Sequence, residues 1–204
     1  VLGVQQYISS QITASVEREI PKATGVTASV PLAHIPSNLT SDSIKFAKIN
    51  IESFALMESG TKTSLDISLS NISKSKPTQV GSLEVIATIP ASTITKLSEF
   101  NDAQIVGNNL QVSTGAGGIG TALLAPKYLD GKLYFELKSI SFLDQEIRAE
   151  SLPAELQDQI KSKSQRSLTP PKGLKVKSVS LSSKGLSVKM FGKNIELGNL
   201  GSGL

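Results

Sequence analysis

The stretch that decides the fold is LPAELQDQIKSKSQRSLTPPKGLKVKSVSLSSKGLSVKMFGKNIEL, residues 152–197. In its first part, apolar residues recur at multiples of four: Leu152, Leu156, Ile160 and Leu168. This spacing predicts a helix over 153–167, with Pro153 at the first helical position. The pair Pro170–Pro171 forbids continuation, so we expect the helix to end before Thr169.

Beyond Gly173 the apolar period changes from four residues to two, which predicts a β-hairpin. A turn at 183–185, Ser-Lys-Gly, separates its strands. The inner face of the hairpin is apolar and comprises Leu174, Val176, Leu186, Val188 and Met190. Such a face needs a partner surface, and the preceding helix is the nearest candidate.

The order of this C-terminal unit resembles the C-terminal signature of the LmeA-like phospholipid-binding family, exported cell-envelope proteins of actinobacteria and some other bacteria. Residues 16–26, VEREIPKATGV, resemble the N-terminal helix and turn of the family, and 89–100, IPASTITKLSEF, resemble its central helix. Together with 130–142, DGKLYFELKSISF, the resemblance covers most of the chain. One departure is 35–39, IPSNL, where family members more often have a Gly-Phe-Pro type turn. The resemblance implies a roll related to the tubular lipid-binding architecture.

Elsewhere the apolar spacing predicts helices over 2–20 and 91–100, and strands in almost everything between the helices. The strands include an alternation over 83–87 and a turn at Asp130–Gly131. The strand expected over 44–56 changes phase twice, so either both faces are partly buried or a bulge redirects it. We therefore expect an α+β fold, with a long, curved antiparallel sheet of about ten strands and three helices on its concave side. Residues 1–197 would form one domain, and 198–204 a flexible tail.

Composition narrows the function classes. The chain has 204 residues, a net charge of +4 and no cysteine, so neither disulfides nor thiolate chemistry can occur. Its positive charge comes mostly from lysine, which suits an anionic surface weakly, whereas nucleic-acid recognition favours arginine and stacking aromatics. The longest uncharged run, 103–126, contains glycines and amides that a bilayer core would not accept, so we expect no membrane span there.

Two features could indicate catalysis or a cofactor, and neither has the required context. The motif Gly115–Gly120, GAGGIG, satisfies G-x-G-x-x-G, but only Thr121–Ala125 precede Pro126, too short for a helix that would hold a pyrophosphate. A glycine-rich strand connection is the better interpretation. The single histidine, His34, has neither a second histidine nor a cysteine to share a metal with. We expect no cofactor, no metal site and no enzymatic activity.

The candidate ligand site combines apolar and basic residues. Nine cations occur within residues 161–193, and three of them alternate with apolar positions, as expected of a solvated outer face: Lys175, Lys177 and Lys189. Residues around the junction of helix and hairpin are predicted to bind a lipid headgroup: Lys161, Arg166 and Lys172. Apolar residues of amphipathic elements are predicted to line an acyl-chain cavity between the sheet and the helices: Leu97, Phe100, Phe135, Leu156, Ile160 and Met190.

These observations and the resemblance lead to one functional expectation. The protein would be a non-catalytic, monomeric phospholipid-binding or lipid-transfer protein of the bacterial cell envelope, with anionic phospholipid and the membrane surface as partners and no nucleic acid. Because the chain starts at Val1 without an initiator Met, we expect that an upstream segment, a signal peptide or an anchor, is missing from it. The resemblance implies an exported, periplasmic location. The alternative is a cell-envelope interaction or scaffold domain whose interior is filled by its own side chains.

Overall fold

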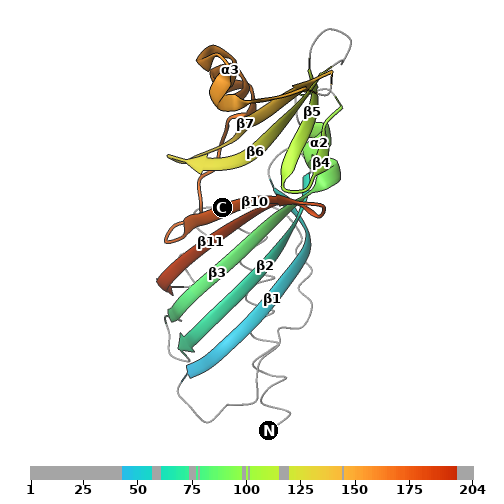
Figure 1. Ribbon diagram of the computed structural model, residues 1–204. Coiled ribbons are helices and arrows are strands. Elements are labelled where there is room, and N and C mark those ends of the chain that lie inside the picture. Colours follow the sequence, from blue (N-terminus) through green and yellow to red (C-terminus); the bar gives the residue numbers. More distant parts are fainter. Residues whose placement is uncertain are drawn as a thin grey trace. The chain divides into compact units, whose positions relative to one another are not determined.

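The computed structural model describes residues 43–56, 61–73, 77, 79–97, 100, 102–114, 120–143 and 145–196. Within these residues the chain is mostly antiparallel β-structure with few helices, so the predicted α+β class is confirmed (Figure 1). The helix expected over 2–20, His34 and the tail 198–204 lie outside the described residues.

The described strands form two sheets, whereas the sequence pattern predicted one long sheet. Alternation of apolar and polar residues shows which segments are strands, but it does not show which strand edges pair. Close backbone contacts also divide the chain into two compact units. Unit 1 comprises Val1–Thr88, Pro170–Lys177 and Val188–Leu204, and unit 2 comprises Ile89–Thr169 and Ser178–Ser187. The expectation of a single domain stays a prediction.

The first sheet has five strands in the order β1-β2-β3-β11-β10. Their bounds are β1 Ser43–Leu56, β2 Thr61–Ser73, β3 Gln79–Pro90, β10 Lys175–Ser182 and β11 Gly185–Glu196. The pairing of β1 with β2 shifts register between Ile51 and Phe54. This irregularity agrees with a bulge, one of the two interpretations that the phase changes in 44–56 allowed.

The core of unit 1 follows the predicted period of two. On β3, Leu83, Val85 and Ala87 are all buried, and Leu83 is paired with the buried Leu69 of β2. On β11, Val188 and Met190 are buried, while Lys189 between them forms an ion pair with Glu84 at 2.8 Å. The alternation therefore separates an apolar face from a charged one, as the sequence indicated.

The second sheet contains β4 Gln104–Val106, β5 Asn109–Thr114, β6 Gly120–Leu129, β7 Lys132–Phe142 and β8 Gln145–Arg148 in this order, with β9 Arg166–Ser167 also paired to β7. The turn between β6 and β7 is Asp130–Gly131, as predicted, and both residues have positive φ, 50° and 74°. Such angles are typical of a two-residue hairpin turn, which explains the Asp-Gly pair.

In the described part of the chain, three helical segments accompany these strands: α2 Ala91–Leu97, the single-turn 3-10 helix η2 Ala149–Ser151, and α3 Ala154–Ser164. Helix α2 begins directly after Pro90, as expected, and ends at Leu97 rather than at 100. Helix α3 has Pro153 as its N-cap. The predicted extension of α3 to 167 is wrong, because Arg166 and Ser167 pair with β7 as β9.

The predicted hairpin is confirmed as β10 and β11, and its turn depends on Gly185. The φ angle of Gly185 is 135°, and a Cβ at this position would overlap the backbone carbonyl of Ile89. The adjacent Lys184 carbonyl accepts a hydrogen bond from the Ala91 N–H at 3.2 Å. The turn therefore lies directly against the start of α2, where no side chain larger than hydrogen fits.

Candidate functional site

Unit 2 contains an apolar core that includes part of the predicted lipid site. The core cluster comprises Ile94, Leu110, Val112, Ala122, Leu124, Phe135, Leu137, Ala149, Leu181 and Leu186. Phe100, Leu156 and Ile160 are only partly buried and pack against this cluster. Four of the six residues predicted to line an acyl-chain cavity, Phe135 and these three, therefore share one apolar interior.

The other two predicted cavity residues lie elsewhere. Met190 is buried on β11, in unit 1. Leu97 is the last residue of α2 in unit 2, and its side chain lies outside the described residues. The spacing of apolar residues placed all six on amphipathic elements, but it could not show which elements share an interior.

Ser164 fixes the C-terminal end of α3 against the free edge of β7. Strand β8 pairs with Ser139–Phe142 and β9 pairs with Lys132–Leu133, which leaves the middle of this edge unpaired. There the Phe135 N–H donates to the Ser164 hydroxyl at 2.9 Å, and that hydroxyl donates to the Ile160 carbonyl at 2.8 Å. One serine thus completes the hydrogen bonds of a buried strand residue and connects the helix to it.

The sequence contained a signal for this contact. In the four-residue apolar spacing of 152–168, Ser164 is the one position without an apolar side chain. We expected this position to lie inside the helix. The structure instead uses it to end α3, and Leu168 beyond it donates its N–H to the Gly131 carbonyl at 2.9 Å.

Arg166 has a structural task besides its predicted headgroup role. Its Nη1 donates to the carbonyls of Lys163 and Gln165, at 3.0 and 2.9 Å. A guanidinium at a helix C-terminus satisfies carbonyls that lack a partner within the helix and interacts favourably with the helix dipole. Arg166 nevertheless remains exposed, on the strand position opposite Leu133.

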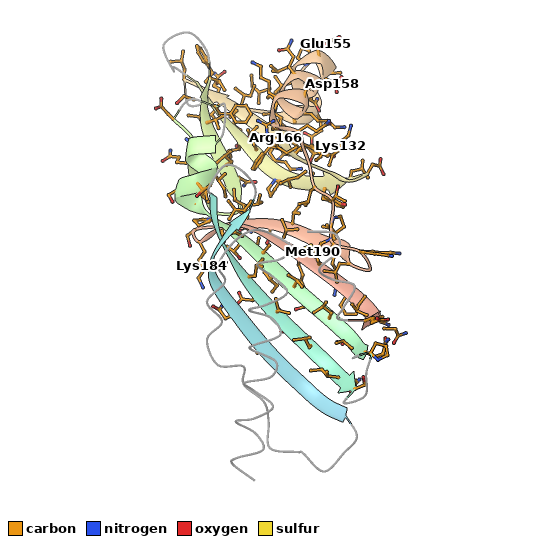
Figure 2. The ribbon with its side chains drawn as sticks, turned by 180° about the vertical axis from the view of Figure 1, so that it is seen from behind. Lys132, Glu155, Asp158, Arg166, Lys184 and Met190 are labelled. Carbon is orange, nitrogen blue, oxygen red and sulfur yellow. The ribbon has the colours of Figure 1, made fainter. Side chains whose placement is uncertain are left out.

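Lys161, also predicted to bind a headgroup, is exposed and lies over an aromatic ring. Its Nζ is 4.8 Å from the centroid of Tyr134 on β7. This cation–π contact keeps the ammonium group near β7 while leaving it accessible. Arg166 and Lys132 are found beside α3 in Figure 2, and the pairing of β9 with β7 makes them neighbours. Three basic residues of unit 2 therefore lie around the C-terminal half of α3.

Glu136 is the acidic counterpart on β7. The Lys138 Nζ lies 2.7 Å from its Oε2, and the Lys127 Nζ lies 3.7 Å from the same atom. The hydrogen bond from Lys138 is the main cause that lowers the pKa of Glu136; burial opposes it, and the charges of Lys138 and Lys127 lower the pKa further. Glu136 is thus ionised at neutral pH and held between two lysines.

Lys172, the third predicted headgroup residue, is exposed and belongs to unit 1. The structure therefore groups Lys161 and Arg166 in one unit and Lys172 in the other. Sequence proximity to the helix–hairpin junction suggested all three, because the junction is where the chain passes from unit 2 to unit 1.

A surface depression of about 480 Å³ lies on α3, lined by Glu155, Asp158, Gln159, Ser162 and Lys163. All five lining residues come from one helix, and they include two carboxylates and an ammonium group. None of the nine predicted site residues lines it. This depression lies on the solvent side of α3, and its lining residues are polar or charged.

Three further features bear on function: metal ligands, membrane-spanning helices and the glycine motif. Among the described residues, no three His, Cys, Asp or Glu side chains gather as metal ligands. No helix in the described part of the chain is long and apolar enough to cross a membrane. Gly120 begins β6, which pairs antiparallel with β5, so a strand and not a helix follows the glycine motif. This topology agrees with the interpretation of the motif as a strand connection.

Comparison with known proteins adds no assignment of family or function. No protein-family model matches the chain, and no curated protein or solved structure matches it. The resemblance to the LmeA-like family therefore stays a prediction from the sequence.

Proposed function

We propose that the protein binds phospholipid without catalysis, with acyl chains held against the apolar core of unit 2. The observation that supports this proposal is the set of half-buried apolar side chains, Phe100, Leu156 and Ile160, packed on a fully buried cluster. An acyl chain at these side chains would complete their burial. Export to the cell envelope and transfer of lipid between membranes belong to the same proposal.

The acyl chains and the headgroup of a bound phospholipid contribute differently to its affinity and to its selectivity. Burial of an acyl chain is worth about 0.8 kcal/mol per methylene against water, so the chains dominate the gross affinity. Against a membrane donor this contribution nearly cancels, because the chains are already buried there. Selectivity must then come from the headgroup, where each exposed lysine–phosphate pair contributes about 0 to 1 kcal/mol.

The proposed headgroup contacts in unit 2 are Lys161 and Arg166. Lys161 is held near β7 by the ring of Tyr134, which reduces the side-chain entropy that a phosphate contact costs. Arg166 uses Nη1 to cap α3 and remains exposed beside β7. Lys172 belongs to unit 1, and its role in headgroup binding stays a prediction.

The direct test is extraction of the purified protein with organic solvent and identification of any lipid it carries. We expect phospholipid at a defined stoichiometry, with anionic species enriched. Ile160→Asp places a charge where the chain would lie and should abolish capture. The matched control is Asp158→Asn on the solvent side of the same helix, which should capture lipid like the wild-type protein.

Folding of each variant is checked by circular dichroism. If Ile160→Asp loses helix or strand signal, Ile160→Ala provides the second measurement, with reduced capture expected from an intact fold. A wild-type protein that captures no lipid from detergent-dispersed phospholipid would overturn the proposal. The alternative of a scaffold domain with a self-filled interior would then take its place.

A further inference from the structure

The turn between β6 and β7 presents an exposed apolar side chain among lysines. Leu129, the last residue of β6, is 55% exposed. It is paired with Lys132, the first residue of β7, and two positions further along the strands Lys127 is paired with Tyr134. Directly paired residues of antiparallel strands point to the same side of the sheet, and so do residues two apart. These four residues therefore share one face.

Helix α3 adds a third lysine to this face. Lys161 lies over the ring of Tyr134, which is itself on the face. We call the resulting surface the basic turn face, and it comprises Lys127, Leu129, Lys132, Tyr134 and Lys161. It joins the β6–β7 turn to the proposed headgroup residue Lys161 within one unit.

The charge of the basic turn face is positive. Asp130 in the turn and Glu136 on β7 are its acidic neighbours, and Glu136 is already engaged by Lys127 and Lys138. In the described part of the chain, Lys132 and Lys161 have no carboxylate partner. Both ammonium groups are exposed. They are therefore available to an anionic partner.

We propose that the basic turn face docks unit 2 on the surface of an anionic phospholipid bilayer. Leu129 enters the interfacial layer, the ring of Tyr134 lies at headgroup level, and Lys132 and Lys161 contact lipid phosphates. An apolar tip flanked by lysines and an amphipathic aromatic ring is the composition that membrane interfaces favour. This inference rests on the proposed function, because docking is the step at which a lipid would be collected or delivered.

The residue types favour a bilayer over other anionic partners. Lys161 covers one face of the Tyr134 ring, which leaves less of the ring for a nucleic-acid base to stack on. Lysines act as point charges and suit a fluid array of phosphates, whereas recognition of one fixed phosphate favours the forked geometry of arginine. The exposed Leu129 gains nothing from a purely ionic partner but is buried by an interfacial layer.

A second exposed apolar turn provides an internal control. At the β7–β8 turn, Phe142 and Leu143 are 47% and 72% exposed. Their described neighbours on β8 are Gln145 and Glu146, so this turn carries no lysine. If apolar exposure alone caused membrane binding, Leu143 would matter more than Leu129. If membrane binding needs lysines beside an exposed apolar side chain, only Leu129 should contribute to it.

The test is co-sedimentation with vesicles of phosphatidylcholine, with and without phosphatidylglycerol, at low and high salt. We expect binding only to the anionic vesicles and a loss of binding as salt rises. Lys132→Glu should weaken binding about 30-fold, since each lysine near an anionic surface contributes about 5-fold and reversal doubles the change in charge. Leu129→Asn should weaken it about 5-fold through the lost apolar contact.

Each variant has a matched control in unit 2. Lys184→Glu reverses an exposed lysine at the β10–β11 turn, and Leu143→Asn removes the exposed leucine at the β7–β8 turn. Long-range electrostatics allow Lys184→Glu a change of at most about 2-fold, and Leu143→Asn should bind like the wild-type protein. If Lys132→Glu and Lys184→Glu weakened vesicle binding equally, binding would depend on net charge alone, and the proposed docking face would be wrong. A loss confined to Leu143→Asn would place docking at the other turn.

Lipid capture from detergent micelles separates this inference from the proposed function. Lys132→Glu and Leu129→Asn should capture detergent-dispersed lipid normally while failing to sediment with vesicles. Ile160→Asp should show the reverse, with sedimentation retained and capture lost. If the wild-type protein captures lipid but ignores anionic vesicles, the docking face is wrong and the proposed function stands. If it sediments with vesicles but captures no lipid, the proposed function fails.

Discussion

The two units of this protein differ in how far their large apolar side chains are exposed. In unit 1, Leu69, Val80 and Leu83 are buried between paired strands, and Val80 and Leu83 are at most 1% exposed. In unit 2, a core of similar burial is bordered by half-buried residues such as Leu156 and Ile160. The described large apolar side chains that remain exposed, from Val106 to Ile147, also belong to unit 2.

This difference indicates that unit 1 contributes mainly to stability and that unit 2 offers apolar surface to a ligand or partner. Apolar area removed from water stabilises a fold, whereas apolar area left at the surface is available to a ligand or partner. None of the described large apolar residues of unit 1 is exposed, although Ile67, Ile86 and Phe191 are half-buried, and their burial contributes to stability. Unit 2 keeps part of that area accessible, including Leu129 on the basic turn face, as the proposed lipid binding would require.

The largest expected contrast between the units is in truncations to alanine. Leu83→Ala removes a fully buried side chain in unit 1 and should lower the free energy of unfolding by about 3 kcal/mol. Leu156→Ala removes a half-buried side chain in unit 2 and should cost about 1 kcal/mol. Urea unfolding measures both values. Equal losses would mean that the border of unit 2 is packed as tightly as the core of unit 1.

An intermediate effect is expected at the edge of β7. Ser164→Ala removes the acceptor of the Phe135 N–H and the contact between α3 and β7, and it should cost about 1 to 2 kcal/mol. Ser162→Ala, on the solvent side of α3, is the control and should change stability by less than about 0.5 kcal/mol. Amide hydrogen exchange of Phe135 provides a local readout. Faster exchange at this amide alone in Ser164→Ala would show that the hydroxyl protects the strand edge.

The smallest expected effect is the pH dependence from Glu136. Its pKa is lowered in the folded state, mainly by the hydrogen bond from Lys138, so the ionised form contributes stability above the ordinary glutamate pKa. This contribution is lost as the pH falls through the lowered pKa. Because the side chain is 41% exposed, it should be worth about 0.5 kcal/mol or less.

Glu136→Gln removes this titrating group. Comparison of urea midpoints at neutral and acidic pH should show a slightly smaller acid destabilisation in the variant than in the wild-type protein. An unchanged difference between the two pH values would mean that water screens the Lys127–Glu136–Lys138 cluster completely.

Much of the fold follows from short-range patterns. The alternation in 83–87, the Asp130–Gly131 turn and the start of α2 after Pro90 were all predicted, and the structure has them. Each depends on backbone preferences and on side chains two to four residues apart. The register shift in β1 fits one of the two interpretations of its sequence, because a change of phase within one strand is a local property.

The candidate site was predicted less completely. Phe135, Leu156 and Ile160 were expected in one interior and share the core of unit 2. Lys132, Leu129 and Ser164 were missed, although lysines flank the Asp-Gly turn in the sequence and Ser164 interrupts the apolar spacing. Their roles depend on which segment lies beside them, and an isolated polar residue does not reveal its partner.

By itself, the sequence determined the strand segments, the helix starts, the turns and the excess of lysine, because these depend on composition and on neighbours along the chain. Only the tertiary structure decided that α3 ends at Ser164, that Arg166 enters β9 and that the strands form two sheets. Each of these depends on hydrogen bonds between segments far apart in sequence, such as Ser164 and Phe135. No local pattern encodes such a pairing, since the same residues would suit several partners until the chain folds.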